Sequence, residues 1–226
     1  MEMDQKRDFT EYLTLIFLKD RQVSKPVFNL VVGLVLMWGF LLNYWIVQYF
    51  PTEWLTALDL WVFLLLYFVM SGVGVVIMLY YEMPLFSFIG YSIMTSTVGF
   101  LLNIYLGYFS GEEVIRAIQY TAWTTFGMII AATLLPKLFM RLHTILAVIV
   151  SSVVVIEFGW ILLFGQSGNF FHWIVAISMC GYIGYHWADM QDCGDTLDQA
   201  IDFGGLLYMA IINLFIRILE LLRLSK

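Results

Sequence analysis

Apolar residues form seven long runs along the chain, separated by short polar connections at positions such as 51–53, 81–83 and 165–169. A helix needs roughly 20 consecutive apolar residues to cross the hydrocarbon core of a bilayer. Connections this short force neighbouring helices to run antiparallel. The pattern therefore predicts an all-α membrane protein with seven transmembrane helices. The expected spans are residues 27–50, 54–80, 84–108, 114–135, 142–164, 170–188 and 203–224.

The last apolar run is interrupted by polar side chains, namely Tyr208, Asn213, Arg217 and Glu220. Polar groups in hydrocarbon are costly unless they find partners, so this helix should be surrounded by protein. We predict that six helices pack around this central C-terminal helix.

The first 26 residues are polar and of mixed charge, and they precede a single transmembrane domain over residues 27–226. The apolar residues of this segment recur at helical spacing, from Phe9 through Tyr12 to Ile16. Two interpretations stay open, a short amphipathic helix lying on the membrane surface and a partly ordered tail.

Composition supports the membrane assignment, because 62% of the 226 residues are hydrophobic and 12% are charged. Soluble domains average about 25% charged residues. The net charge of −6 argues against a nucleic-acid partner, which requires basic patches. Of the two cysteines, Cys180 falls in an expected span and Cys193 in an acidic connection, so neither a disulfide framework nor a metal motif is expected.

Lysine and arginine near the spans predict the orientation. The N-terminal segment and the connection that carries Lys137 and Arg141 are basic, whereas the first and fifth connections have neither residue type. This distribution places the N-terminus in the cytoplasm, although Arg223 and Lys226 at the other end oppose it. The absence of a recognisable targeting signal favours a bacterial inner membrane.

The residues 207–215, Leu-Tyr-Met-Ala-Ile-Ile-Asn-Leu-Phe, resemble the last-helix signature of the transmembrane Bax inhibitor motif family, Leu-Tyr-Leu-Asp-Ile-Ile-Asn-Leu-Phe. The run Asp189-Met190-Gln191 resembles the second signature of that family, at the end of the sixth helix. The resemblance implies six helices around a seventh and, in bacterial relatives, a calcium leak path without enzymatic activity. One departure matters, since Ala210 occupies the position of the last-helix aspartate.

In those relatives the two signature aspartates face each other near the cytoplasmic mouth, and two close carboxylates titrate as a unit. Here the resemblance leaves Asp189 as the gate residue without its partner, because Ala210 cannot titrate. We expect any flux to be less steeply gated by pH than in relatives with both acids. Asp202 is a candidate substitute, Asn213 a further pathway residue, and a solvated helix-end carboxylate the alternative for Asp189. Whether Ala210 is natural or engineered stays open.

Five aspartates recur every three or four residues around the sixth connection, at Asp189, Asp192, Asp195, Asp198 and Asp202. They would share a face on a helix and form an acidic mouth in a loop, which would concentrate cations. The spacing is not that of an EF-hand, and a solvated acidic loop is the other interpretation. The three histidines, His143, His172 and His186, do not have the spacing of a metal site.

Glu157 and Arg217 lie about 14 residues from the cytoplasmic ends of spans five and seven, so the helical rise places them at similar depth. Charges inside a membrane are rarely unpaired, and we predict that these two form a buried ion pair. The pair is interpreted either as a structural link or as a plug on the outer side.

Two functions follow from these observations. The first is a passive cation leak for Ca²⁺ or H⁺, in which Ca²⁺ is the permeant ion and no cofactor is bound. The second is a non-conducting regulator of protein quality control or cell death, which contacts a membrane protein partner through its helices.

Overall fold

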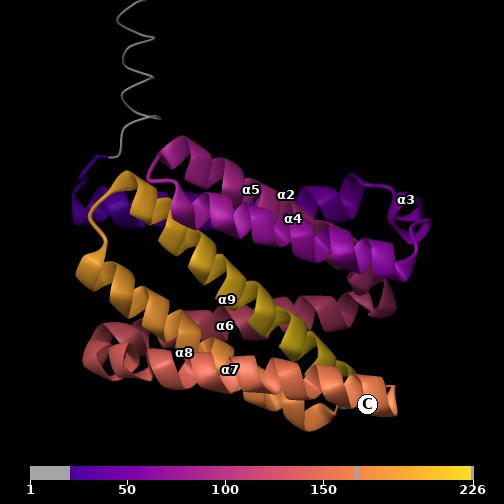
Figure 1. Ribbon diagram of the computed structural model, residues 1–226. Coiled ribbons are helices and arrows are strands. Elements are labelled where there is room, and N and C mark those ends of the chain that lie inside the picture. Colours follow the sequence, from indigo (N-terminus) through magenta and orange to yellow (C-terminus); the bar gives the residue numbers. More distant parts are fainter. Residues whose placement is uncertain (1–20, 166–167, 225–226) are drawn as a thin grey trace, which may run out of the picture. The chain divides into compact units, whose positions relative to one another are not determined.

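The computed structural model describes residues 21–165 and 168–224, and within these ranges the chain is helical (Figure 1). Within these ranges the backbones of Gln22 and Thr196 also pair as one isolated antiparallel β-bridge. The α-helices are α2 (Lys25–Tyr49), α3 (Thr52–Thr56), α4 (Leu60–Tyr80), α5 (Pro84–Tyr105), α6 (Gly111–Leu134), α7 (Pro136–Phe164), α8 (Asn169–Cys193) and α9 (Leu197–Leu224), and a 3-10 turn η1 (Leu106–Tyr108) follows α5. The all-α prediction is confirmed.

Five of the described helices are long and apolar enough to cross a membrane. They are α2, α4, α5 with its 3-10 turn, α7 and α9. The helices α6 and α8, with 24 and 25 residues, are also long enough to cross a membrane but are more polar. Glu112, Glu113 and Arg116 lie in the first turns of α6, and Asp189 and Asp192 lie near the end of α8.

Several helix boundaries differ from the expected spans. The second span does not begin at Trp54, because α3 ends at Thr56 and α4 begins at Leu60. Asp59 stops the chain from continuing as one helix, since its side chain accepts a hydrogen bond from the backbone N–H of Trp61 and caps α4. The helix α9 begins at Leu197 and not at residue 203, so Asp198 and Asp202 are part of this helix. Most of the expected N-terminal segment, residues 1–20, lies outside the described residues.

The chain forms two compact units. Unit 1 contains α2 to α5 and the segment Gly194–Gly205, and unit 2 contains α6, α7, α8 and the part of α9 from Leu206 onwards. The helix α9 therefore contributes residues to both units.

The tightest helix contact of unit 1 joins α4 to α5 at two glycines. A Cβ atom at Gly74 would lie 2.7 Å from the backbone nitrogen of Met94, and one at Gly90 would lie 2.5 Å from that of Met78. Small residues let helix backbones approach closely in a membrane, where van der Waals packing drives association. The hydroxyl of Tyr91 then links α5 to α2 by donating to the carbonyl oxygen of Val35 at 2.9 Å.

Polar side chains make contacts at both ends of α2 within unit 1. The amide nitrogen of Asn103, which is buried, donates to the carbonyl oxygens of Ile46 and Phe50, both at 3.1 Å, at the C-terminal end of α2. At the other end, the Lys25 ammonium donates to the carbonyl oxygen of Gly194 at 2.6 Å. The backbone N–H of Val23 donates to Asp195 at 2.8 Å beside it.

Unit 2 packs around apolar contacts between α6, α7 and α8. Ala132, Phe139 and Ala188 form a buried cluster, one from each helix. Trp187 reinforces this contact, because its indole nitrogen donates to the hydroxyl of Thr133 at 2.9 Å. These contacts hold α7 and α8 side by side, which positions the charged residues described below.

The glycine contact predicts different effects for two substitutions on α4. A Cβ atom at Gly74 would meet the α5 backbone, whereas one at Gly72 would meet nothing within 4 Å. We expect Gly74→Ala to lower the free energy of unfolding in mixed micelles by about 1–3 kcal/mol, the cost of overpacking a tight contact. Gly72→Ala is the matched control and should leave stability unchanged or slightly higher. Equal losses for the two variants would contradict a close approach at Gly74.

Candidate functional site

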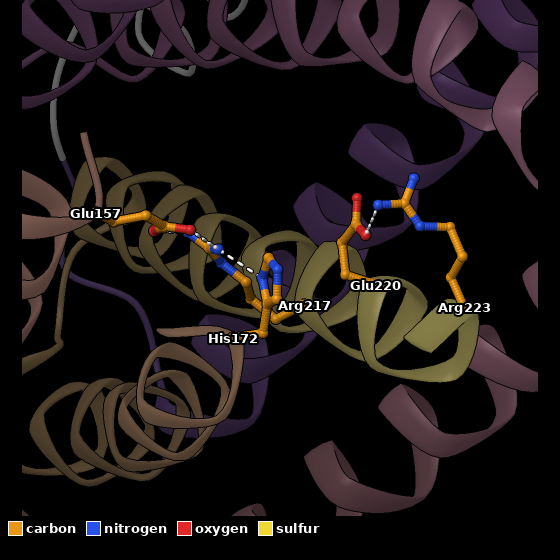
Figure 2. A network of polar contacts seen from close by, with 5 residues as sticks. All are labelled: Glu157, His172, Arg217, Glu220 and Arg223. Carbon is orange, nitrogen blue, oxygen red and sulfur yellow. Dashed lines mark hydrogen bonds and ion pairs between the residues drawn. The ribbon is translucent and has the colours of Figure 1, made fainter. Parts of the chain in front are cut away.

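The structure brings Glu157 of α7 and Arg217 of α9 together as a two-pronged ion pair (Figure 2). The Nη1 nitrogen of Arg217 donates to Oε1 of Glu157 at 2.8 Å, and Nη2 donates to Oε2 at 2.9 Å. The Glu157 side chain is 9% exposed and the Arg217 side chain 20% exposed. This fork geometry matches the planar guanidinium to the carboxylate, and it is the strongest form of the Arg–carboxylate interaction.

His172 is a third member of this network, contributed by the first turn of α8. Its ring nitrogen Nδ1 lies 2.9 Å from Nη1 of Arg217 (Figure 2). A guanidinium has only donors, so Nδ1 must accept this hydrogen bond. The imidazole is therefore neutral in this arrangement, with its proton on Nε2.

A second ion pair lies one turn further along α9. Nη2 of Arg223 lies 2.8 Å from Oε2 of Glu220, and the Glu220 side chain is 11% exposed while that of Arg223 is 51% exposed. The Arg223 guanidinium also lies over the Phe109 ring, 5.5 Å from its centre. Because Arg217, Glu220 and Arg223 are spaced by three residues, they follow one side of α9.

Asp189 lies half-buried near the end of α8, where its side-chain partners belong to the same helix. It hydrogen-bonds Tyr185 one turn earlier and Cys193 one turn later. Partial desolvation raises the pKa of the Cys193 thiol above its usual value, and the carboxylates of Asp189 and Asp192 raise it further. This thiol is therefore a weaker nucleophile at neutral pH than an ordinary cysteine.

Ala210 and Asn213 both belong to the part of α9 in unit 2. Ala210 is 3% exposed, and its methyl group offers no charge to any neighbour. The amide nitrogen of Asn213 donates to the carbonyl oxygen of Met209 one turn earlier, at 2.7 Å. One N–H of the Asn213 amide is thus bonded within its own helix.

The other acidic residues of the predicted mouth lie in different settings. Asp192 and Asp195 are exposed, and Asp202 is half-buried on α9. Asp198 is 5% exposed and accepts a hydrogen bond from the Ser87 hydroxyl of α5 at 2.6 Å. In unit 1 this contact ties α9 to α5, so Asp198 stabilises the packing and does not face open solvent.

Sequence reasoning did not assign His172 to the charged pair. A partial signal for it existed, because Glu157 lies seven residues before the end of α7 and His172 lies three residues after the start of α8. Both residues are therefore near the same connection, but their depths differ by about four residues of helical rise, roughly 6 Å. Among the described residues no group of three or more His, Cys, Asp or Glu side chains is placed to hold a metal ion.

The apolar helices, with a network of paired charges between them, define an integral, multi-pass membrane protein of all-α fold. A family model described as "Inhibitor of apoptosis-promoting Bax1" matches residues 20–226, and the chain belongs to this Bax inhibitor family. The family predicted from the last-helix residues is thereby confirmed. A comparison with curated proteins finds no match.

The buried ion pair predicts a large loss of stability when one partner is removed. Glu157→Leu or Arg217→Met leaves a buried charge without its partner, and each should lower the free energy of unfolding by about 3–5 kcal/mol. The double variant should recover most of this loss, because it leaves no unpaired charge. Chemical unfolding of the purified protein in micelles measures all three.

The matched control is the exposed pair of Glu112 and Arg116 on α6, whose side chains are 73% and 57% exposed. Arg116→Met should change stability by less than about 1 kcal/mol, since water screens this pair. If the Glu157 and Arg217 variants had effects as small as this control, the pair would not be a buried charge interaction.

Proposed function

We propose that this protein is a passive leak pathway for cations, with Ca²⁺ as the permeant ion and H⁺ as the second candidate. In this proposal all seven long helices cross the membrane, with α9 as the central helix. The observation that supports it best is the Glu157–Arg217 pair, which places a carboxylate and its counter-ion inside apolar helices. Ionisable residues in a membrane are expensive to keep and commonly mark ion pathways.

The ion pair is proposed as the closed state of a gate. Ca²⁺ binds oxygen ligands, and a carboxylate is the ligand it prefers. Both oxygens of Glu157 are occupied by the Arg217 guanidinium, so the carboxylate is not available to a cation. When Arg217 moves away, Glu157 becomes an anionic site for a permeating ion, and the pathway opens.

Asp189 is proposed as the cation contact on the cytoplasmic side, with Asp192 near it at the end of α8. Two coupled carboxylates would give a steep dependence on pH, and Ala210 removes one of them. We therefore propose that flux through this protein is less steeply gated by pH than in relatives with both carboxylates. A steep titration between about pH 6 and 8 that Asp189→Asn abolishes would contradict this.

The alternative function is a non-conducting regulator that acts through helix contacts with a membrane partner. Ala210 favours it, because the family carboxylate at this position is absent. Absence of flux at every pH would support the regulator and exclude the leak.

Flux through liposomes tests the gate by the opposite signs of two variants. Arg217→Gln frees the Glu157 carboxylate and should raise Ca²⁺ flux, by about tenfold if the pair holds the gate by about 1.4 kcal/mol. Glu157→Gln leaves the Arg217 guanidinium without its carboxylate. The unpaired guanidinium repels Ca²⁺, so flux should fall. Glu112→Gln, on the exposed pair of α6, is the control and should leave flux unchanged. If both pair variants lowered flux alike, the pair would be only a structural link.

The proposed orientation places the N-terminus in the cytoplasm of a bacterial cell, with the protein in the inner membrane. Cys193, at the end of α8, then faces the cytoplasm. A membrane-impermeant maleimide should label it in inverted vesicles and not in intact spheroplasts. Labelling should be slow at about pH 7, because the carboxylates of Asp189 and Asp192 disfavour the reactive thiolate. It should be faster at about pH 9, where more of the thiol is ionised.

Cys193→Ser is the control, since any label that remains belongs to Cys180 inside α8. Labelling of Cys193 from the outer side would reverse the proposed orientation.

A further inference from the structure

We propose that His172 is a proton-binding site that controls the Glu157–Arg217 pair. This inference rests on the proposed function for its effect on ion flux, while the proton-binding site itself is a property of the folded network. The observation behind it is that one nitrogen, Nη1 of Arg217, donates both to Oε1 of Glu157 at 2.8 Å and to Nδ1 of His172 at 2.9 Å. Arg217 is therefore held by α7 on one side and by α8 on the other.

Only neutral His172 can hold Arg217 in this way. Once Nδ1 carries a proton, it becomes a donor and faces another donor at hydrogen-bond distance. The hydrogen bond is then lost, and a second positive charge lies beside the guanidinium. His172 is 7% exposed, so water screens this repulsion poorly.

The charged groups that act on His172 come from two helices. They are Arg217, Glu220 and Arg223 of α9 and Glu157 of α7. With neutral His172 these four formal charges cancel. A protonated His172 gives this network a net positive charge. The imidazolium then competes with Arg217, which lies between His172 and Glu157 (Figure 2), for the Glu157 carboxylate.

Competition for Glu157 releases Arg217 from its two-pronged contact. In the proposed gate this is the opening step, so acidification should raise flux through His172 and not through a carboxylate pair. A single titrating site predicts a shallow, one-proton dependence on pH, which agrees with the loss of the second family carboxylate at Ala210.

The other two histidines provide matched controls because they lie in different surroundings. The His143 ring packs on Tyr185, with 4.7 Å between ring centres, and the His186 ring stacks on Tyr182 at 5.6 Å. Within the described ranges, neither of these two rings has a hydrogen bond with an arginine like that of His172. Since the chain has three histidines, the imidazole signals of the whole protein can be assigned with single substitutions.

Nitrogen NMR of the full-length protein in nanodiscs, labelled at histidine, tests the site directly. At about pH 7.5, His172 should be neutral with the proton on Nε2, and on acidification the signal should shift to that of the imidazolium. The Glu157→Leu/Arg217→Met double variant removes the donor without leaving a buried charge, and the Nε2–H preference should be lost in it. A charged His172 at about pH 7.5, a proton on Nδ1, or an unchanged tautomer in the double variant would overturn the proposal.

Calcium flux in liposomes tests the consequence. We expect wild-type flux to rise about threefold or more between about pH 7.5 and pH 5.5, a range that histidine governs. His172→Asn retains an acceptor near the position of Nδ1 and cannot be protonated, so it should remove this rise, whereas His143→Asn should keep it. A rise that persists in His172→Asn would overturn the regulation. If no variant conducts at any pH, the proposed leak fails, while the NMR titration still decides whether His172 is the proton site.

Discussion

A charge inside apolar helices must be neutralised by a partner, and this constraint organises unit 2. Apolar helix surfaces in a membrane make non-directional contacts, so they do not by themselves decide which face of a helix turns inward. The Glu157–Arg217 pair does decide it, because rotation of α7 or α9 about its axis would separate two buried charges at a cost of several kcal/mol, roughly 3–5. The contact from Arg217 to His172 extends the same restriction to α8.

Several hydroxyl groups of the described spans donate within their own helix. Ser92, Ser96 and Thr97 of α5 each donate to the carbonyl oxygen four residues earlier, at 2.7–2.8 Å. The bond that each of these hydroxyl groups donates does not depend on a neighbouring helix. The network of Glu157, His172 and Arg217 differs, since its partners come from three helices and its interactions depend on how these helices pack. It is therefore the part of unit 2 in which a small change of charge would have the largest structural effect.

The chain belongs to the Bax inhibitor family. Asp189 lies at the end of α8 and Ala210 on α9, so these two positions do not form a pair of coupled carboxylates. Asp189 instead has partners along its own helix, Tyr185 and Cys193. The buried histidine beside Arg217 is a separate titratable group, and the proposed proton sensitivity rests on it.

The sequence by itself determined the elements, because long apolar runs must become helices in a bilayer and short connections limit how they turn. It also determined the family, since the residues 207–215 and Asp189 with Gln191 carry the resemblance, and it indicated Glu157 and Arg217 as partners by their similar depth. Local capping was harder to predict, as the break at Asp59 shows, because one side chain that bonds a backbone N–H can end an apolar run. Only the tertiary structure decided that His172 accepts from Arg217 and that Asp198 is buried against Ser87. Such contacts depend on how helices distant in sequence are rotated and packed, which no local pattern of residues specifies.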